Sequence, residues 1–521
     1  MLDAKKVILT LADNTTNTIT DSSRLSTEED YSAAIYSKED LIINGNGTLN
    51  VNAGYRNGIK STDDCIIVSG TLNITSTEDG IIGKDLCGVV AGDININAGS
   101  DGIKSTYDTD TTKGNVIIEG GNITIKASND GIQAENILVI NDGTINIKTN
   151  NGAADTTQTH TDNMYMGRGG FGFNNNKTTT TTDDTVESRK GIKAGNMLII
   201  NDGDITIDSD DDSVHCNSEI YIYGGTINAA TGDDGVHADD LLTVNGGTIN
   251  ITQCYEGIEA DDIVINDGDI SVVSSDDGIN SSDGSITING GNLLINASGD
   301  GLDANGSIII NGGYIVVLGP TSDGDTAIDY DDSCTINGGT VMAFGSSGML
   351  EIPKGAINGA CIVTAFTSVS GGSKYTLSDS NGNEILSYTP SKAYAAAIVY
   401  SDKITTGNTY DITAGSTTLS IEVTSDVTSN VSSGLGKAGG MNKPGNGGSG
   451  MHNNGSSDNG MNGNSNGSMP DMSGNGAPDM NGNSSGDMPS MGGNSSNNSG
   501  NMPNMNNGSS NGNAPQMNNR M

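Results

Sequence analysis

Acidic residues recur at one position of a repeating segment, in most cases every 21 to 23 residues. This acid column consists of Asp79, Asp101, Asp130, Asp212, Asp234, Glu256, Asp277 and Asp300. Further acids stand directly before it or shortly after it, namely Glu78, Asp211, Asp233, Asp276, Asp239, Asp240, Asp261 and Asp262. If each repeat is one coil of stacked strands, the carboxylates lie about 5 Å apart, and each like-charge pair costs about 3 kcal/mol at an effective dielectric of about 20. Such a ladder requires cations.

Local salt bridges cannot neutralise this charge, because residues 194 to 353 contain 28 acidic residues and no Lys or Arg. Hard oxygen ligands without thiolates favour Ca²⁺. We therefore predict that the calcium ligands come from Asp233, Asp234, Asp239, Asp240, Glu256, Asp261, Asp262, Asp276, Asp277 and Asp300. The alternative is that each Asp-Gly pair only forms a turn and that water screens the charge.

A second column, three positions after the acids, is expected to point outward. It changes from basic to acidic along the chain and consists of Lys60, Ile82, Lys104, Gln133, Lys193, His215, His237, Glu259, Asn280 and Asp303. Its two histidines stand one repeat apart, so a transition-metal pair is an alternative to two exposed surface histidines.

Four of the residues near the acid column suit carbohydrate recognition. Tyr255 could stack on a sugar ring or only shield the corner of the coil. Side chains with hydrogen-bonding groups project beside it on the outward column. The predicted carbohydrate-binding residues are Tyr255, His237, Glu259 and Asn280.

The elements that must position these residues are short strands. The local pattern Ile-x-Ile-Asn-Gly-Gly-Thr-Ile-x-Ile, as at residues 286–295, alternates with a period of two and has no helical period. A large apolar residue follows each acid-column turn, as at Ile103 and Ile258, and a small residue follows two positions later. Strict columns at a repeat near 22 predict an all-β, right-handed parallel β-helix of about 12 coils.

Two other columns are interpreted as structural. Asparagines share one turn position, and we expect an internal asparagine ladder from Asn201, Asn245, Asn266, Asn289, Asn311 and Asn337. The six cysteines form no CxxC motif, and Cys65 and Cys87 are one repeat apart. We expect buried free cysteines rather than a disulfide or a zinc site.

The repeat also sets the predicted domains. Residues 1–349 form the β-helix, and its segment 150–189, rich in Thr, Gly and Asn, is a predicted flexible insertion. Residues 350–430 alternate without the repeat and contain the hairpin signal Asn381-Gly382, which predicts a small β cap over the last coil. Residues 431–521 are rich in Gly, Asn, Ser and Met and are predicted to be a disordered tail.

Composition excludes several function classes. The net charge of −41 disfavours nucleic acid and anionic membranes as partners. No apolar stretch reaches the length of a membrane span, so we expect no membrane insertion. The first residues lack the apolar segment of a signal peptide, and the chain begins almost directly in strand-like sequence, so we expect the natural N-terminus to lie upstream. We expect a monomer.

Several segments resemble a bacterial carbohydrate-binding β-helix family. They are DDGVHAD at 233–239, YEGIE at 255–259, DDGIN at 276–280, KGIKA at 190–194, GPT at 319–321 and AIDY at 327–330. The segment DSVH at 212–215 departs from the pattern because Ser213 replaces the turn glycine. The resemblance covers residues 7 to about 425. It implies a pectate-lyase-like fold, calcium binding, cellulose and polygalacturonate as ligands, no established catalysis, and an extracellular or cell-surface location.

Together these observations predict a non-catalytic, calcium-dependent polysaccharide-binding protein whose partner is an acidic or cellulosic glycan. The absence of Trp disfavours flat crystalline cellulose as the main ligand. One alternative is a calcium-dependent polyuronate lyase, which needs a strong base beside the metal. The basic residues Lys60, Lys104 and Lys193 stand outside the acidic coils. The other alternative is a purely structural surface adhesin.

Overall fold

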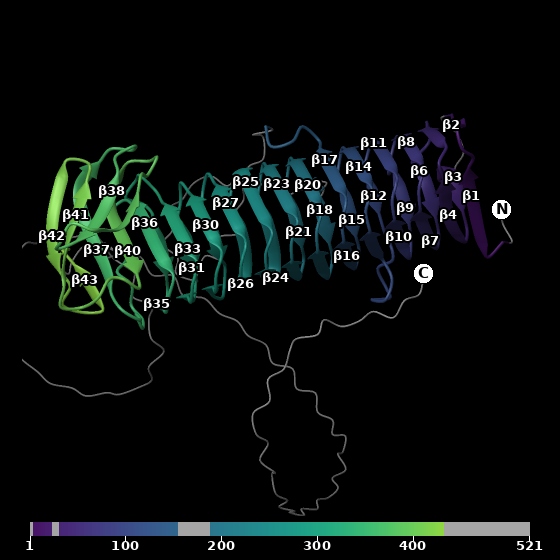
Figure 1. Cartoon of the computed structure of the whole chain (residues 1–521). Helices are drawn as coiled ribbons and strands as arrows, with labels where there is room; N and C mark the ends of the chain where they lie inside the picture. Colours follow the sequence, from purple (N-terminus) through teal and green to yellow (C-terminus); the bar gives the residue numbers. More distant parts are fainter. Residues whose placement is uncertain (1–3, 23–30, 155–187, 432–521) are drawn as a thin grey trace, which may run out of the picture. The chain divides into compact units, whose positions relative to one another are not determined.

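The computed structural model describes residues 4–22, 31–154 and 188–431, which all lie within one structural unit, residues 1–443. The secondary structure of these described residues is β-strand, without an α-helix (Figure 1). The predicted tail beyond residue 431 and the central part of the predicted insertion, residues 155–187, lie outside the described residues. Within the described ranges no helix is long and apolar enough to cross a membrane.

The strands form three parallel stacks, as expected for a β-solenoid of about a dozen coils. The first stack follows the acid column and contains β3 (Ala33–Ser37), β6 (Asn57–Ser61), β9 (Ile81–Gly83), β12 (Ile103–Lys104), β15 (Ile132–Ala134), β18 (Ile192–Ala194), β21 (Val214–Cys216), β28 (Ile279–Ser281), β31 (Leu302–Ala304) and β34 (Ile328–Tyr330). Two longer strands, β24 (Val236–Val244) and β26 (Ile258–Ile265), span both the first stack and the second.

The second stack is made by the next strand of each coil. It contains β1 (Lys6–Leu11), β4 (Asp40–Gly45), β7 (Asp64–Ile67), β10 (Leu86–Val89), β13 (Asn115–Ile118), β16 (Ile137–Ile140), β19 (Met197–Ile200), β22 (Glu219–Ile222), β29 (Ile286–Ile288), β32 (Ser307–Ile310) and β35 (Ser333–Ile336). The strands are parallel and in register from coil to coil, for example Ile199 with Tyr221.

The third stack completes each coil. It contains β2 (Thr16–Asp21), β5 (Thr48–Ala53), β8 (Thr71–Ser76), β11 (Asp93–Ala98), β14 (Asn122–Ala127), β17 (Thr144–Thr149), β20 (Asp204–Ser209), β23 (Thr226–Thr231), β25 (Thr248–Gln253), β27 (Asp269–Val273), β30 (Asn292–Asn296), β33 (Tyr314–Leu318) and β36 (Thr340–Gly345). The predicted fold class, a parallel β-helix, is therefore confirmed.

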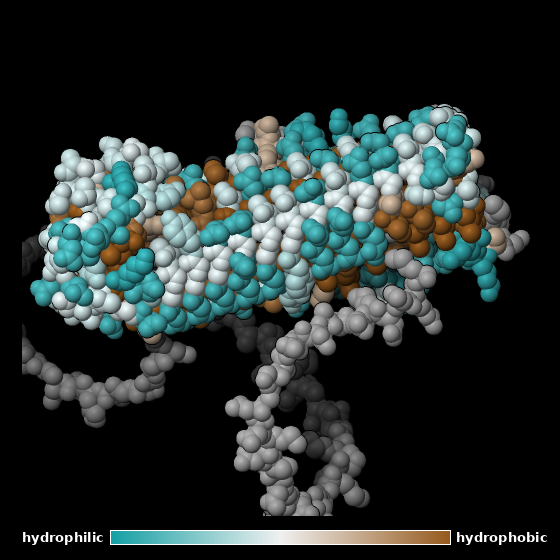
Figure 2. Space-filling model, in the orientation of Figure 1, coloured by the Kyte–Doolittle hydropathy of each residue, from teal (hydrophilic) through white to brown (hydrophobic). Residues whose placement is uncertain are grey.

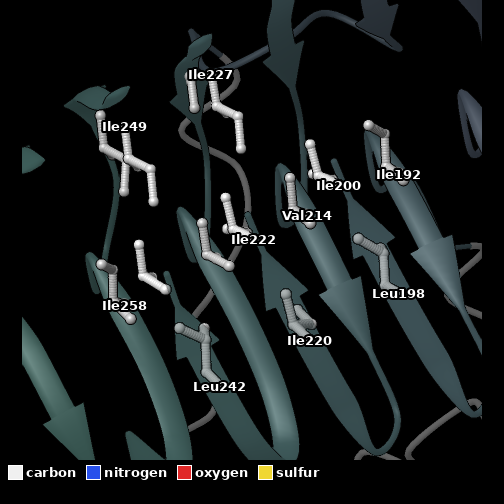
Figure 3. Packing of buried hydrophobic residues seen from close by; sticks show 14 of the residues in the cluster. Ile192, Leu198, Ile200, Val214, Ile220, Ile222, Ile227, Leu242, Ile249 and Ile258 are labelled. Carbon is white, nitrogen blue, oxygen red and sulfur yellow. The ribbon is translucent and has the colours of Figure 1, made fainter. Parts of the chain in front are cut away.

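The core is a set of stacked aliphatic columns (Figure 3). Equivalent side chains of successive coils lie beside one another, as Ile192 and Val214 do, and both are fully buried. The small residues two positions later, such as Ala194 and Cys216, are buried as well. Because alternate residues of a strand point to opposite faces, the same strands also carry an outward column at fixed positions.

The glycine that follows seven of the eight acid-column residues is required by close packing. A Cβ added at Gly235 would lie 2.4 Å from the Ile251 side chain and 2.5 Å from the Gly257 carbonyl oxygen. Ser213 occupies the same position one coil earlier, where Ala229 stands in register with Ile251. The smaller alanine leaves room for the serine side chain, so the departure from the glycine pattern is compensated within one coil.

A small β cap follows the last coil. Strand β40 (Tyr394–Ser401) pairs antiparallel with β36, and β37 (Cys361–Val369) and β43 (Val427–Ser429) extend this sheet. A separate four-stranded sheet contains β38 (Tyr375–Asp379), β39 (Glu384–Tyr388), β41 (Thr409–Ala414) and β42 (Thr417–Glu422). The turn between β38 and β39 contains Asn381 and Gly382, as the hairpin signal predicts. The open edge of β36 is thereby paired.

The predicted asparagine ladder exists, but it is not internal. Asn266, Asn289, Asn311 and Asn337 each donate to the amide oxygen one coil earlier, for example Asn289 Nδ2 to Asn266 Oδ1 at 2.7 Å. These four residues are exposed, and Asn245, at the start of this run, is half-buried. The prediction of a buried ladder is wrong because the turn directs the side chain outward. The cysteine prediction is confirmed, since all six are buried and free, and Cys65 lies in register with Cys87.

The face shown in Figure 2 is mostly polar, with hydrophobic residues gathered near β4 and β7. Ile8, Ile42 and Ile66 form one outward column on this part of the second stack. Ile8, on the terminal strand β1, is 57% exposed.

Candidate functional site

The acid column first serves the backbone. In seven of its eight residues, one carboxylate oxygen accepts the backbone N–H of the equivalent position on the next coil, whereas Glu256 Oε2 accepts from Asn280 Nδ2. The N–H of Asp130 donates to Asp101 Oδ1 at 3.0 Å, and the N–H of Asp300 donates to Asp277 Oδ1 at 2.6 Å. These N–H groups lie at a tight corner where no strand partner is available, so the carboxylates satisfy donors that would otherwise be unpaired.

The second oxygen faces the outward column, and in one part of the chain it meets a lysine or a histidine. Lys104 Nζ lies 2.7 Å from Asp101 Oδ2, and the Nδ1 of His215 lies 2.8 Å from Asp212 Oδ2. The same relation holds, at longer distance, for Lys193 with Asp130 and His237 with Asp234. We call Asp101, Asp130, Asp212 and Asp234 the cation-paired segment.

Lys190 strengthens this segment by occupying an acid-column position itself. Its backbone N–H donates to Asp130 Oδ1, and its Nζ lies 2.9 Å from Asp211 Oδ1 and 2.6 Å from Asp212 Oδ2. Burial alone would lower the pKa of Lys190, but the two carboxylates raise it further than burial lowers it. Although burial opposes it, Lys190 also holds the pKa of Asp212 well below its usual range.

The pattern changes after Asp234. Glu256, Asp277 and Asp300 continue the column, but none of the described Lys, Arg or His residues forms a salt bridge with them. We call these three residues the acid-paired segment. Their partners on the outward column are Glu259, Asn280 and Asp303, which lie in register on neighbouring coils.

Like charge and burial perturb the carboxyl groups of this acid-paired segment. Burial, reinforced by Glu259, raises the pKa of Glu256 to about 9. Burial and then Asp303 raise the pKa of Asp277 to about 7. Burial, with Asp277 and Asp303 beside it, raises the pKa of Asp300 to about 8. At neutral pH Glu256 and Asp300 therefore hold protons, and Asp277 is partly protonated, unless another cation replaces these protons.

One oxygen cluster in this segment has the composition of a calcium site. Asp277, Asp300 and Asp303 each offer a carboxylate oxygen, and the three oxygens lie within 4.8 Å of one another. The set contains only hard oxygen ligands, which Ca²⁺ prefers. Asp303 was assigned to the outward column from the sequence but was not predicted as a ligand.

The described residues contain four further groups that could hold a metal. Two include histidine, namely Asp212 with His215 and His237, and Asp234 with His237 and Glu259. Asp211, Asp212 and Asp233 form a third, which Lys190 partly neutralises. The fourth, Asp40 with Asp63 and Asp64, lies in the first coils, and Lys6 stands 3.4 Å from Asp40. This last group was not predicted from the sequence, although the adjacent acids at 63 and 64 follow Asp40 by about one repeat.

The predicted calcium ligands are thus only partly brought together. Asp234, Asp277 and Asp300 belong to clusters around the column, and Asp233 belongs to the group neutralised by Lys190. The acids after the next corner have other partners. Hydrogen bonds from serines reach Asp240 (from Ser218), Asp261 (from Ser282) and Asp262 (from the N–H of Ser285), while Asp239 lies 3.7 Å from His237. Asp276 belongs to none of the five groups.

The predicted carbohydrate-binding residues lie along one edge of the first stack. His237, Glu259 and Asn280 occupy equivalent positions on three successive coils. Asn280 Nδ2 donates to Glu256 Oε2 at 2.9 Å. Tyr255 directly precedes Glu256 and is half-buried. This edge therefore combines one ring with carboxylate, amide and imidazole groups.

Comparison with known proteins identifies the family. A family model described as "Carbohydrate-binding domain-containing protein" matches residues 1–235 and 233–422. The chain belongs to this family. A similar curated relative, a carbohydrate-binding domain-containing protein of Acetivibrio thermocellus, is 39% identical over 75 residues. That match covers 14% of this chain and 26% of the relative, so the chain spans about a quarter of the relative's length. No solved structure matches.

Proposed function

We propose that this protein is a non-catalytic polysaccharide-binding protein that binds acidic glycans such as polygalacturonate through calcium. Membership of a carbohydrate-binding domain family supports a carbohydrate partner. The observation that carries the calcium dependence is the acid-paired segment, where half-buried carboxylates continue along the coils and no Lys, Arg or His of the described residues pairs with them. In this proposal the protein acts as a monomer outside the cell or on its surface.

Calcium fits the cluster of Asp277, Asp300 and Asp303 for two reasons. The donors are oxygens alone, and the fold already commits one oxygen of Asp277 to a backbone N–H, which orients the remaining oxygen. The raised pKa values of Asp277 and Asp300 show that the folded protein disfavours these negative charges in the absence of a cation. A divalent cation offsets that cost.

The same cation would link the protein to its ligand. A uronic acid carries a carboxylate at each residue, and Ca²⁺ accepts six to eight oxygen ligands, more than three side chains supply. Sugar carboxylates can therefore complete the coordination, while Asn280 and Glu259 offer hydrogen bonds and Tyr255 offers a ring. A neutral glycan such as cellulose lacks the carboxylate and should bind more weakly.

The test measures binding of polygalacturonate and cellulose with calcium and with chelator. The parent should bind polygalacturonate in calcium and lose most of the affinity in chelator. Asp277→Asn and Asp300→Asn should weaken both calcium and glycan binding, whereas Tyr255→Ala should weaken glycan binding alone. Asp283→Asn is the charge-matched control, because Asp283 is an exposed acid of the same coils outside the metal groups.

Two results would contradict the proposal. If chelator leaves polygalacturonate affinity unchanged, calcium does not mediate binding. If the parent binds neither glycan under either condition, the adhesin alternative gains support. Release of unsaturated products from polygalacturonate would instead favour the lyase alternative.

A further inference from the structure

His237 stands at the boundary between the cation-paired and acid-paired segments. Its Nδ1 lies 3.3 Å from Asp234 Oδ2, 3.7 Å from Glu259 Oε2 and 3.8 Å from Asp212 Oδ2. These carboxylates come from three successive coils. The stacking of the coils therefore places all three around one ring nitrogen. The same position carries His215 on the preceding coil and Glu259 on the next.

The surroundings of this nitrogen hold the ligands in place. Asp212 has a side chain only 2% exposed, and Lys190 and His215 both contact its Oδ2. Asp234 is 9% exposed and accepts the backbone N–H of Glu256 on its other oxygen. The ring of His215 packs edge-on against that of His237, with centroids 4.9 Å apart.

We propose that His237, Asp234 and Glu259 bind a first-row transition metal of the Zn²⁺ type. A tetrahedral ion with bonds of about 2.0–2.2 Å separates its ligand atoms by about 3.3–3.6 Å. The distances from His237 Nδ1 to the oxygens of Asp234 and Glu259, 3.3 and 3.7 Å, are close to this spacing. The oxygens of Asp234 and Glu259 and the His237 nitrogen all lie within 4.8 Å of one another.

The second nitrogen of His237 supports the same assignment. Its Nε2 lies 3.7 Å from Asp239 Oδ1. Metal-binding histidines commonly direct the opposite ring nitrogen to a carboxylate, which fixes the tautomer and raises the basicity of the ligand. Asp239 would then be a positioning residue rather than a ligand.

This site differs from the proposed calcium cluster in chemistry and place. Imidazole nitrogen favours zinc and its neighbours in the first transition row, whereas Asp277, Asp300 and Asp303 supply oxygen alone. The acid-column members of the two sites, Asp234 and Asp277, are two coils apart, which corresponds to about 10 Å along the solenoid. Each site can therefore be removed without the other.

The experiment titrates the full-length protein with Zn²⁺ by calorimetry in excess calcium and repeats the titration with Co²⁺, followed by visible absorption. We expect one Zn²⁺ per chain and a Co²⁺ spectrum of nitrogen and oxygen ligation. His237→Lys should abolish both signals, and Asp239→Asn should weaken Zn²⁺ affinity by about 10–100-fold. His237→Lys should still fold, because Lys104 and Lys193 occupy the equivalent position of earlier coils; its melting curve checks this.

Two matched variants control for other sources of binding. Asp277→Asn should leave Zn²⁺ affinity unchanged, since it alters only the calcium cluster. The two remaining histidines of the chain, His160 and His452, lie outside the described residues, and His160→Gln with His452→Gln should keep the signal. Absence of Zn²⁺ binding, binding that survives His237→Lys, or displacement of Zn²⁺ by calcium would overturn the assignment. In that event a protonated His237 is itself the counter-ion of the three carboxylates.

Discussion

The cation-paired and acid-paired segments share one backbone and differ in one column of side chains. In both, a carboxylate oxygen accepts the N–H of the next coil, as Asp101 does for Asp130 and Asp277 does for Asp300. In the first segment the other oxygen meets Lys104 or a histidine, and in the second it meets Asp303 or Glu259. The comparison shows that the acid column becomes a candidate ion site when the neighbouring outward column carries acidic instead of basic side chains.

The largest expected effect concerns pH, because four carboxyl groups act together. The raised pKa values of Glu256, Glu259, Asp277 and Asp300 are about 9, 8, 7 and 8. A carboxyl with a raised pKa in the folded state contributes stability that is fully present below its unfolded pKa, near 4, and is lost as pH rises through the folded value. In chelator, the melting temperature should therefore fall between about pH 5 and about pH 9.

Calcium should flatten this pH profile, since the ion supplies the charge that protons supply at low pH. By mass action, calcium at about 100 times its Kd adds about 2.7 kcal/mol to the free energy of unfolding. Thermal melts at several pH values, with calcium and with chelator, measure both effects. Coincident curves in the two solutions would refute the calcium site, and a flat profile in chelator would refute the proposed protonation.

The second prediction concerns the loss of a lysine from the cation-paired segment. Lys190→Met removes the partner of Asp211 and Asp212 while keeping much of the side-chain volume. Because the Lys190 side chain is only 14% exposed, we expect a loss of about 3–5 kcal/mol in the free energy of unfolding. Urea denaturation measures it. Lys374→Met is the control, since Lys374 forms an exposed salt bridge with Glu384 and should change stability by less than about 1 kcal/mol.

The third prediction concerns a substitution that gives the acid-paired segment the basic neighbour of the cation-paired segment. Asp303 occupies the column position of Lys104 and Lys193, so Asp303→Lys gives Asp300 and Asp277 a cation. We expect stability in chelator to rise by about 2 kcal/mol, through charge-assisted hydrogen bonds, and the response to calcium to disappear. Melts with and without calcium test it. A variant that keeps the full calcium response would show that the ion binds elsewhere.

The fold was predictable from the sequence because it depends on columns of apolar residues with one spacing. Ile103 and Ile258 mark the interior, and no knowledge of the backbone was needed to place them inside. The column of Lys104, His237 and Asp303 was also recognisable as one position of the repeat. These features depend only on the period and on the alternation of a strand.

The details of the site depended on geometry that the period does not specify. The hydrogen bond from the Asp130 N–H to Asp101 requires the direction of a backbone N–H at a corner. For the same reason the asparagine ladder was expected inside although Asn289 is exposed. Sequence proximity also suggested Asp262 as a ligand, whereas the coil turns before it and Asp262 accepts a backbone N–H instead.

The smallest expected effect tests whether an uncharged ladder behaves like the acid column. Asn289 donates to Asn266 and accepts from Asn311, each at 2.7 Å, so Asn289→Ala removes two amide hydrogen bonds. Water replaces them because the residues are exposed, and we expect a loss of about 0.5–1.5 kcal/mol. Urea denaturation should give the same loss in calcium, in chelator and at each pH, since no titratable group takes part. A loss that depends on calcium would mean that the amide ladder is coupled to the ion cluster, and the two columns could then no longer be treated as independent parts of the same coil.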